Sequence, residues 1–277
     1  MNPILSQQDA ASYYHVHCYG EGEQTLVLAH GFGCDQQIWQ ALLPLVTPFF
    51  RVVCFDYAGC GQSDPQLLEQ RGYRQLADYV EDLNRVVATY APQGCLLLAH
   101  SISGAIGMQA SMSKPQLYQR IITIGPTACY LNDPDDGYQG GFNRDDIDGL
   151  LDMMERNYFD WAGYLAPQVM ANLERPEYAE VLREKFLATN PLHARRFAEV
   201  TFFTDIRPLL PQVTVPVDIL YCQEDIIVPI TAIDYLAAHL PQARRFELAA
   251  RGHYPHISAP AAVAETFFAC LQDSAYE

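Results

Sequence analysis

The 277-residue sequence has few positive charges: Lys and Arg number 17 against 33 Asp and Glu, for a formal net charge of −16. A surface of this sign repels a phosphate backbone, and no cluster of Lys and Arg overrides it locally. Charged residues make up only 18% of the chain and hydrophobic residues 49%, the balance of a globular protein. We therefore expect a large folded core and no nucleic-acid partner.

Long hydrophobic runs are also missing, and no stretch approaches the ~20 apolar residues that a membrane-spanning helix needs. The first ten residues, MNPILSQQDA, contain neither the basic nor the apolar segment of a secretory signal. The chain has no low-complexity segment and no internal repeat. These absences predict a soluble, cytoplasmic protein without a membrane partner.

The eight cysteines form no C-x-x-C pair, and Cys54, Cys95 and Cys222 lie within or beside apolar runs. Scattered cysteines of this kind favour reduced structural thiols over a disulfide or zinc framework. No other metal-ligand spacing is present, and the glycine pair at 59 and 61 lacks the third glycine of a phosphate-binding loop. We expect neither a metal nor a cofactor.

Short β-rich runs alternate with helical patterns along the chain, which predicts an α/β fold with a mostly parallel central sheet flanked by helices. Several runs are almost wholly apolar, as strands buried on both faces are. The expected strands cover residues 24–29, 51–55, 95–99, 120–124, 215–221 and 245–248, with an antiparallel edge from 12–19.

Between residues 124 and 215 the pattern changes, because no convincing strand occurs and apolar residues recur at helical spacing. Asn143, followed by two aspartates, is a plausible helix start. The apolar stripe that follows consists of Ile147, Leu150, Leu151, Met154, Tyr158, Trp161 and Leu165. We interpret residues 127–211 as a helical cap, inserted into a core domain of residues 1–126 and 212–277.

The stretch LLLAHSISGA at residues 96–105 places Ser101 between a predicted strand and a predicted helix. A strand that turns sharply into a helix is the setting of a nucleophile elbow, usually written G-x-S-x-G. Ala99 and Ser103 stand where that pattern has glycines. The turn requires small residues more than glycine itself, and Gly104 still lets the helix approach the sheet. We therefore predict that Ser101 is a nucleophile.

A serine hydroxyl needs a base to take its proton and an acid to orient that base. In this kind of fold the three follow in the order Ser, Asp, His, each on a loop after a strand. Asp225 and His253 satisfy both conditions and are the predicted acid and base. Glu224 is an alternative acid, and His100 and His256 are alternative bases, although His100 immediately precedes the serine and should point away from it.

Two backbone amides are needed to hold an oxyanion. One is expected from Ile102, which follows the serine at a helix start. The other is expected from Phe32, in the sequence His-Gly-Phe-Gly at residues 30–33, where two glycines let the loop turn its amides inward.

Six segments of the chain resemble the α/β-hydrolase superfamily, and within it the RsbQ-like stress-response regulatory hydrolases and their plant relatives, the karrikin and strigolactone receptors. The family usually has a glycine where Ala99 stands. The resemblance covers the whole chain and implies an α/β-hydrolase fold with a four-helix, V-shaped cap inserted after the sixth strand. The segments are HGFGCDQQIW (30–39), FDYAGCGQSD (55–64), GPTACYLNDP (125–134), GGFNRDD (140–146), NYFDWA (157–162) and RGHYPH (251–256).

The resemblance also implies a mostly apolar pocket that contains the serine, histidine and aspartate. A wall without charges favours a small hydrophobic ligand carrying an ester or lactone, because a buried charge needs a partner. Carried over residue by residue, the wall consists of Phe32, Phe142, Leu150, Trp161, Leu165, Thr201, Phe202 and Ile227.

We therefore expect a serine hydrolase that acts in signalling, and the resemblance implies a partner such as a PAS-domain-bearing phosphatase or cyclase. One alternative is a binding module in which hydrolysis is incidental and the ligand moves the cap. Another is a metabolic hydrolase of carbon–carbon bonds or esters, which a charged pocket would support. Epoxide hydrolases and haloalkane dehalogenases usually have aspartate at the elbow, so Ser101 disfavours both.

Overall fold

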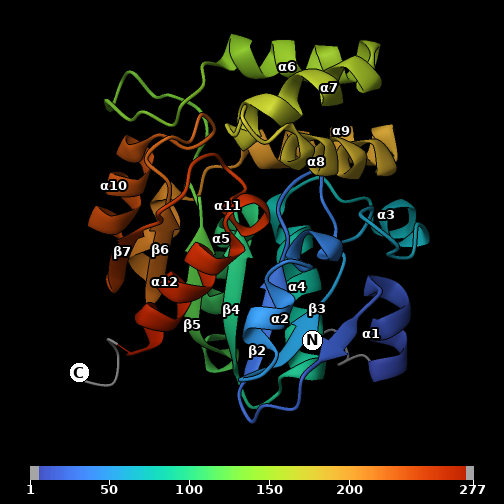
Figure 1. Ribbon diagram of the computed structural model, residues 1–277, viewed down its shortest axis with the longest axis vertical. Coiled ribbons are helices and arrows are strands. Elements are labelled where there is room, and N and C mark those ends of the chain that lie inside the picture. Colours follow the sequence, from blue (N-terminus) through green and yellow to red (C-terminus); the bar gives the residue numbers. More distant parts are fainter. Residues whose placement is uncertain (1–5, 273–277) are drawn as a thin grey trace.

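The computed structural model describes residues 6–272, and a seven-stranded sheet forms its centre (Figure 1). The strand order is β1-β3-β2-β4-β5-β6-β7; β1 is antiparallel to β3, and every other pair is parallel. This confirms the predicted, mostly parallel sheet. The strands are β1 (His17–Tyr19), β2 (Thr25–Ala29), β3 (Arg51–Cys54), β4 (Cys95–His100), β5 (Tyr118–Ile124), β6 (Val217–Tyr221) and β7 (Ala243–Glu247).

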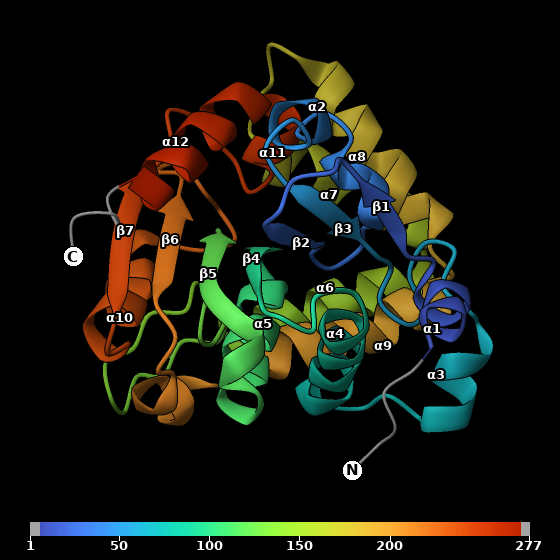
Figure 2. The same cartoon turned by 90° about the horizontal axis from the view of Figure 1, so that it is seen from below.

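The central strands are buried because their sequences are apolar on both faces. All six residues of β4 are buried, and β4 lies between β2 and β5 in parallel register. Helices cover both faces of the sheet, with α4 and α5 on one face and α12 and α2 on the other (Figure 2). These helices are α2 (Leu43–Val46), α4 (Leu76–Tyr90), α5 (Ile102–Ser113) and α12 (Pro260–Gln272).

Helix α1 (Gln7–Tyr14) packs against α4, and helix α10 (Ile230–His239) packs against β6 and β7. The other helices outside residues 144–203 are α3 (Gln66–Arg71), α11 (Pro255–Ser258) and three short 3₁₀ helices at Gln36–Trp39, Pro115–Leu117 and Arg207–Gln212. Among the helices of residues 6–272, none combines the length and the apolar character needed to cross a bilayer.

The N-terminal edge differs from the prediction. We expected strand from 12 to 19, but residues up to Tyr14 belong to helix α1, and only His17–Tyr19 pair with β3. Ser6 begins this helix, since its hydroxyl accepts a hydrogen bond from the Asp9 amide. The edge therefore contributes one short strand to the sheet.

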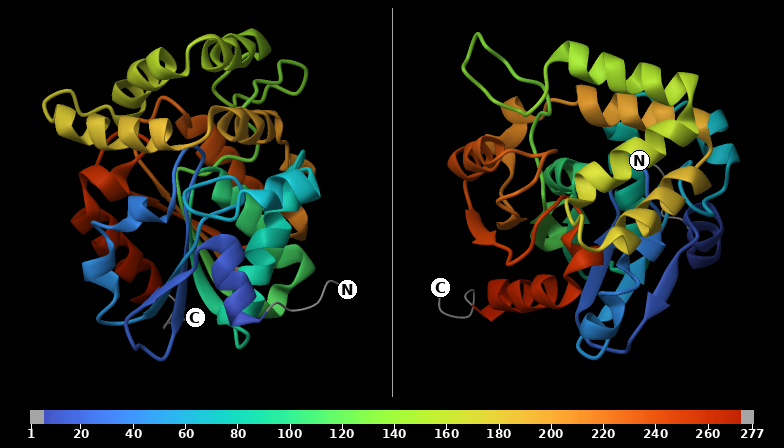
Figure 3. Two further views of the ribbon diagram at one scale, coloured as in Figure 1. Left: turned by 90° about the vertical axis from the view of Figure 1, so that its right-hand side faces the viewer. Right: turned by 45° about the horizontal axis from the view of Figure 1, so that its top comes forward.

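Four helices lie over the carboxyl edge of the sheet, and in the sequence they come between β5 and β6 (Figures 1 and 3). We expected these helices after the sixth strand, whereas they follow β5, which is the fifth of the seven described strands in chain order. Helix α6 packs against α7 and α9, and α7 packs against α8. The four are α6 (Arg144–Arg156), α7 (Tyr158–Met170), α8 (Pro176–Ala188) and α9 (Pro191–Phe203). The division into core and cap domains stays a prediction.

Capping side chains set where the first two of these helices begin. Asn143 and Asp146 form a capping box at the start of α6, which confirms Asn143 as a helix start. Asn157 ends α6 and caps α7, where its side chain accepts from the Asp160 amide. The predicted apolar stripe is therefore divided between two helices at Asn157.

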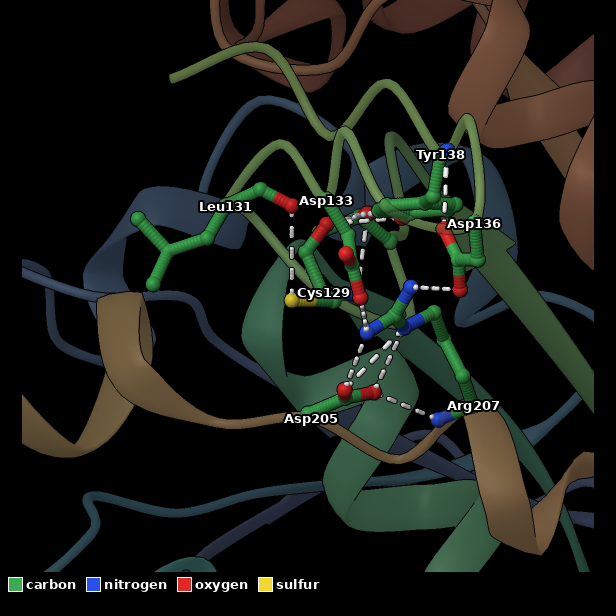
Figure 4. A network of polar contacts seen from close by, with 8 residues as sticks. Cys129, Leu131, Asp133, Asp136, Tyr138, Asp205 and Arg207 are labelled. Atoms are coloured by element: carbon green, nitrogen blue, oxygen red, sulfur yellow. Dashed lines mark hydrogen bonds and ion pairs between the residues drawn. The ribbon is translucent and has the colours of Figure 1, made fainter. Parts of the chain in front are cut away.

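One arginine connects the two segments that join the sheet to the four helices, one before α6 and one after α9. The Arg207 guanidinium lies 2.7 Å from the Asp205 carboxylate, 3.0 Å from that of Asp133 and 2.8 Å from that of Asp136 (Figure 4). Backbone bridging of Cys129 with Asp205 joins the same two segments. These contacts fix the base of the four-helix layer on the sheet.

Candidate active site

Ser101 lies on a strained turn between β4 and α5. Its φ of 56° and ψ of −124° fall in a region that L-residues rarely adopt, at a cost of about 1–3 kcal/mol. Ala99 is fully buried in β4, and a Cβ on Gly104 would come within 2.9 Å of the Pro126 side chain. The strand, the turn and the close helix approach predicted for this segment are therefore present.

Ser103, the second departure from G-x-S-x-G, has a contact of its own. Its hydroxyl donates a 2.5 Å hydrogen bond to the carbonyl of His30, which begins the predicted oxyanion loop. A glycine at position 103 has no such group. The departure thus ties the elbow to the neighbouring loop.

His253 and Asp225 complete a continuous chain of hydrogen bonds with the serine. Nε2 of His253 lies 2.8 Å from Oγ of Ser101, and its Nδ1 lies 2.7 Å from Oδ2 of Asp225. The side chains of His253 and Asp225 are only 3% and 4% exposed. The structure thus brings together the three residues that the sequence singled out, although they are up to 152 positions apart.

The loop after β6 fixes the orientation of the acid. Oδ1 of Asp225 accepts hydrogen bonds from the amides of Ile227 and Val228, which leaves Oδ2 for the imidazole. Glu224, the alternative acid, is exposed, and it contacts the histidine loop through its backbone carbonyl, which accepts from the Gly252 amide. The geometry therefore favours Asp225 as the partner of the imidazole.

The loop that contains Phe32 is held against the elbow. Nε2 of His30 accepts from the Tyr57 amide, so Nδ1 carries the proton and donates to the Gly31 carbonyl. Tyr254 donates its hydroxyl hydrogen to the carbonyl of Phe32. Ile102, the other predicted donor, is the first residue of α5, where amides lack an acceptor within the helix.

A cavity of about 30 Å³ opens beside the serine. Five of the eight predicted wall residues line it, together with the serine and histidine and four residues that the prediction missed. The predicted members are Phe32, Leu165, Thr201, Phe202 and Ile227, and the additional ones are Tyr130, Val169, Phe186 and Tyr254. The lining contains no Asp, Glu, Lys or Arg, in agreement with the expected absence of charge.

Phe142, Leu150 and Trp161 do not line this cavity, which corrects the predicted wall. The Trp161 ring packs against Phe32 and Phe186, and these two rings line the cavity in its place. Phe142 packs on the Phe202 ring and is half-buried, as is Leu150. Trp161 and Phe142 therefore pack behind residues of the wall.

Tyr130 is the functional candidate that the sequence reasoning missed. Its hydroxyl lies 3.1 Å from Oγ of Ser101, and burial raises the pKa of this phenol above its ordinary value. Tyr130 therefore stays protonated beside the serine and can donate a hydrogen bond there. Its position in the segment 125–134, singled out for its resemblance, was the only available signal.

The alternative histidines do not approach the nucleophile in the same way. The His256 ring packs against the Trp39 ring in a tilted arrangement at a centroid distance of 4.6 Å, and burial lowers the pKa of His256 to about 3. His100 is also fully buried, with its Nε2 bound to a backbone carbonyl. The imidazole that reaches Ser101 is that of His253.

Residues 6–272 contain no group of three or more His, Cys, Asp or Glu side chains arranged to hold a metal ion. All eight cysteines are free thiols, and all but Cys18 are buried.

Comparison with known proteins identifies the family to which the chain belongs. A sequence profile described as "Alpha/beta hydrolase family" matches residues 26–266. Karrikin insensitive 2 receptor CA of Petunia hybrida is 34% identical over 249 residues, which cover 89% of this chain and 91% of that protein. Strigolactone esterase D14 of Arabidopsis thaliana is 33% identical over 262 residues, covering 94% and 97%.

The similarity extends to three dimensions. The solved structure of a hydrolase from Oleispira antarctica matches with a TM-score of 0.93 at 33% identity, and the match covers 98% of each chain. The chain therefore belongs to the α/β-hydrolase family, as an esterase-like enzyme related to the plant karrikin and strigolactone receptor hydrolases.

Proposed function

We propose that the protein is a serine hydrolase of small hydrophobic esters or lactones, with Ser101 as nucleophile, His253 as base and Asp225 as the residue that orients the base. The observation that carries this proposal is the unbroken hydrogen-bond chain from Oγ of Ser101 through His253 to Asp225, which ends at an uncharged cavity. Such a chain is the arrangement that activates a serine hydroxyl.

The reaction follows from these positions. Oγ of Ser101 attacks the carbonyl carbon of the substrate while Nε2 of His253 takes the hydroxyl proton. The carbonyl oxygen becomes an oxyanion, which the amides of Phe32 and Ile102 stabilise. The tetrahedral intermediate then collapses to an acyl-enzyme, and His253 returns the proton to the leaving oxygen. Water, activated by the same imidazole, releases the acid.

The cavity limits the substrate class. A volume of about 30 Å³ is far below that of a site for a drug-sized molecule, so the cavity favours a short acyl group. The wall is made mainly of aromatic and aliphatic side chains, which favours an uncharged substrate. A carboxylate-bearing substrate of a carbon–carbon bond hydrolase has no cationic partner there.

The biological setting is a further part of the proposal. The relatives named as receptors suggest that hydrolysis serves signalling, and the resemblance to RsbQ-like regulators suggests a PAS-domain partner. The buried free thiols suit a reducing compartment such as the cytoplasm. No cofactor is part of the proposal.

The Ser101→Ala variant tests the catalytic assignment. We expect it to lose p-nitrophenyl acetate hydrolysis and labelling by a fluorophosphonate probe, while its circular dichroism stays that of the parent. A matched control is Ser111→Ala, which removes a buried hydroxyl of α5 that bonds the Met108 carbonyl. Unchanged hydrolysis in a folded Ser101→Ala protein would contradict the proposal.

A second candidate function is a ligand-sensing module, and the small cavity favours it. A ligand larger than the cavity displaces the lining side chains of α7, α8 and α9, and a shift of these helices would transmit its presence to the surface. Signalling by the Ser101→Ala protein in its host distinguishes the two candidates. Retained signalling indicates that binding suffices, and lost signalling indicates that the chemistry is required.

A further inference from the structure

His100 is a buried imidazole that the proposed reaction does not use. It ends strand β4, immediately before the nucleophile, and its ring is 0% exposed. Nε2 of the ring lies 2.8 Å from the backbone carbonyl oxygen of His253. A carbonyl only accepts, so Nε2 carries the proton and Nδ1 does not. The hydrogen bond thus fixes the tautomer of His100.

The peptide units that flank His253 are held from two directions. Its carbonyl accepts from His100 in the sheet, and its amide donates to the carbonyl of Val169 in the last turn of α7, at 2.7 Å. The last carbonyls of a helix have no acceptor role within it, so Val169 is free to bind this amide. The backbone of His253 is therefore fixed between the elbow strand and the four-helix layer.

Close packing on both sides restricts the movement of the His253 backbone. The neighbour of His253, Gly252, has a φ of 80°, and a Cβ there would lie 2.1 Å from the Met170 carbonyl oxygen. On its other side, the His100 ring abuts the oxyanion loop, since a Cβ on Gly31 would lie 2.5 Å from Nδ1. The ring thus spaces the oxyanion loop from the histidine loop.

We propose that His100 is a positioning residue, which places Nε2 of His253 within reach of Ser101 by holding the His253 carbonyl. This inference rests on the proposed role of His253 as the base. An imidazole displaced by a fraction of an ångström takes the serine proton less well, whereas the binding of the substrate is unaffected. Loss of the His100 donor therefore lowers kcat and leaves KM unchanged.

The surroundings keep His100 neutral and so keep the donor in place. Burial lowers its pKa well below the ordinary value, and the neighbouring imidazoles of His256 and His253 act in the same direction. The rings of His256 and Tyr254 pack against it at centroid distances of 4.5 and 4.7 Å. The ring is thus held as an uncharged donor.

The first test is a set of three variants measured with p-nitrophenyl acetate. His100→Phe keeps a ring and removes the donor, and we expect kcat to fall about tenfold to a hundredfold with KM unchanged. His100→Gln extends an amide N–H to the position of Nε2 and should recover most of kcat. His100→Asn has the same amide one carbon shorter and should not. Equal kcat in parent, His100→Asn and His100→Phe would overturn the proposal.

His256→Phe is the matched control, because His256 is equally buried, contacts the same ring and has no hydrogen-bond partner among the described residues. Its kcat should equal that of the parent. A fall as large as that of His100→Phe would show that any change in this buried cluster has the same effect, and would overturn a specific role for the His100 donor.

The second test does not depend on turnover. In protein labelled with ¹⁵N-histidine, long-range ¹H–¹⁵N correlation of the imidazole groups should show His100 protonated at Nε2 alone. Protonation at Nδ1 alone would overturn the inference. A parent enzyme with neither hydrolysis nor fluorophosphonate labelling would contradict the proposed function, and this spectrum would still decide whether His100 carries the Nε2 proton that the bond to the His253 carbonyl requires.

Discussion

The two halves of the candidate site are built differently. The half formed by the sheet carries Ser101, Asp225 and His253 on loops that follow strands, and each is held by backbone hydrogen bonds or backbone strain. The half formed by α7, α8 and α9 contributes side chains such as Leu165 and Phe186, held by packing alone. Substitutions in the first half should alter the rate for every substrate, and those in the second should alter which substrate fits.

The largest expected effect belongs to the sheet half. Asp225→Asn removes the carboxylate that fixes the His253 tautomer, and we expect kcat for p-nitrophenyl acetate to fall about 10⁴-fold. Glu224→Gln, the neighbouring exposed acid, is the control and should leave kcat unchanged. Steady-state kinetics of the two variants measures this difference, and the reverse ranking would assign the acid to Glu224.

The next effect tests the helical half. Phe186→Leu shortens a cavity-lining side chain, so the ratio of kcat/KM for p-nitrophenyl butyrate to that for the acetate should rise about tenfold. Leu150→Ala is the control, since Leu150 lies outside the cavity lining and should leave the ratio unchanged. A general loss of activity in Phe186→Leu with no change in the ratio would contradict the assignment of size selection to these helices.

Tyr130 lies where the two halves meet and sharpens the division between them. Tyr130→Phe removes one hydrogen bond to Ser101, and we expect kcat to fall about fivefold, the equivalent of about 1 kcal/mol. Tyr158→Phe removes a comparable bond, to the Phe186 carbonyl, away from the serine. If the two variants have the same kcat, the Tyr130 hydroxyl has no role at the nucleophile.

The smallest effect concerns the elbow. Ala99→Gly restores the residue usual at this position, and we expect it to lower the free energy of unfolding by about 0.5–1 kcal/mol without changing kcat. Ala29→Gly, its directly paired partner in β2, should cost a similar amount. Urea denaturation measures both. A large gain in kcat in Ala99→Gly would show that the alanine methyl crowds the turn.

The same division explains what could be predicted. The strands that precede Ser101 and Asp225 could be predicted because an apolar run marks a buried strand. Strand β7, which precedes His253, is more polar and only partly buried, so its prediction rested on the alternation of strands and helices along the chain. The helices of residues 144–203 could be predicted from the apolar spacing, but Trp161 was wrongly predicted to line the cavity. A helix buried on several sides has more than one apolar face, so spacing alone does not say which face meets the cavity.

The sequence by itself determined the α/β sheet, the helical insertion and the order of serine, acid and histidine, because strand and helix periodicities and covalent neighbours fix them locally. Only the tertiary structure decided which rings line the cavity, that Tyr130 reaches Ser101, and that His100 holds the His253 carbonyl. The last contact joins residues 153 positions apart. Its existence depends on how α7, β4 and the histidine loop pack together, which no local pattern encodes.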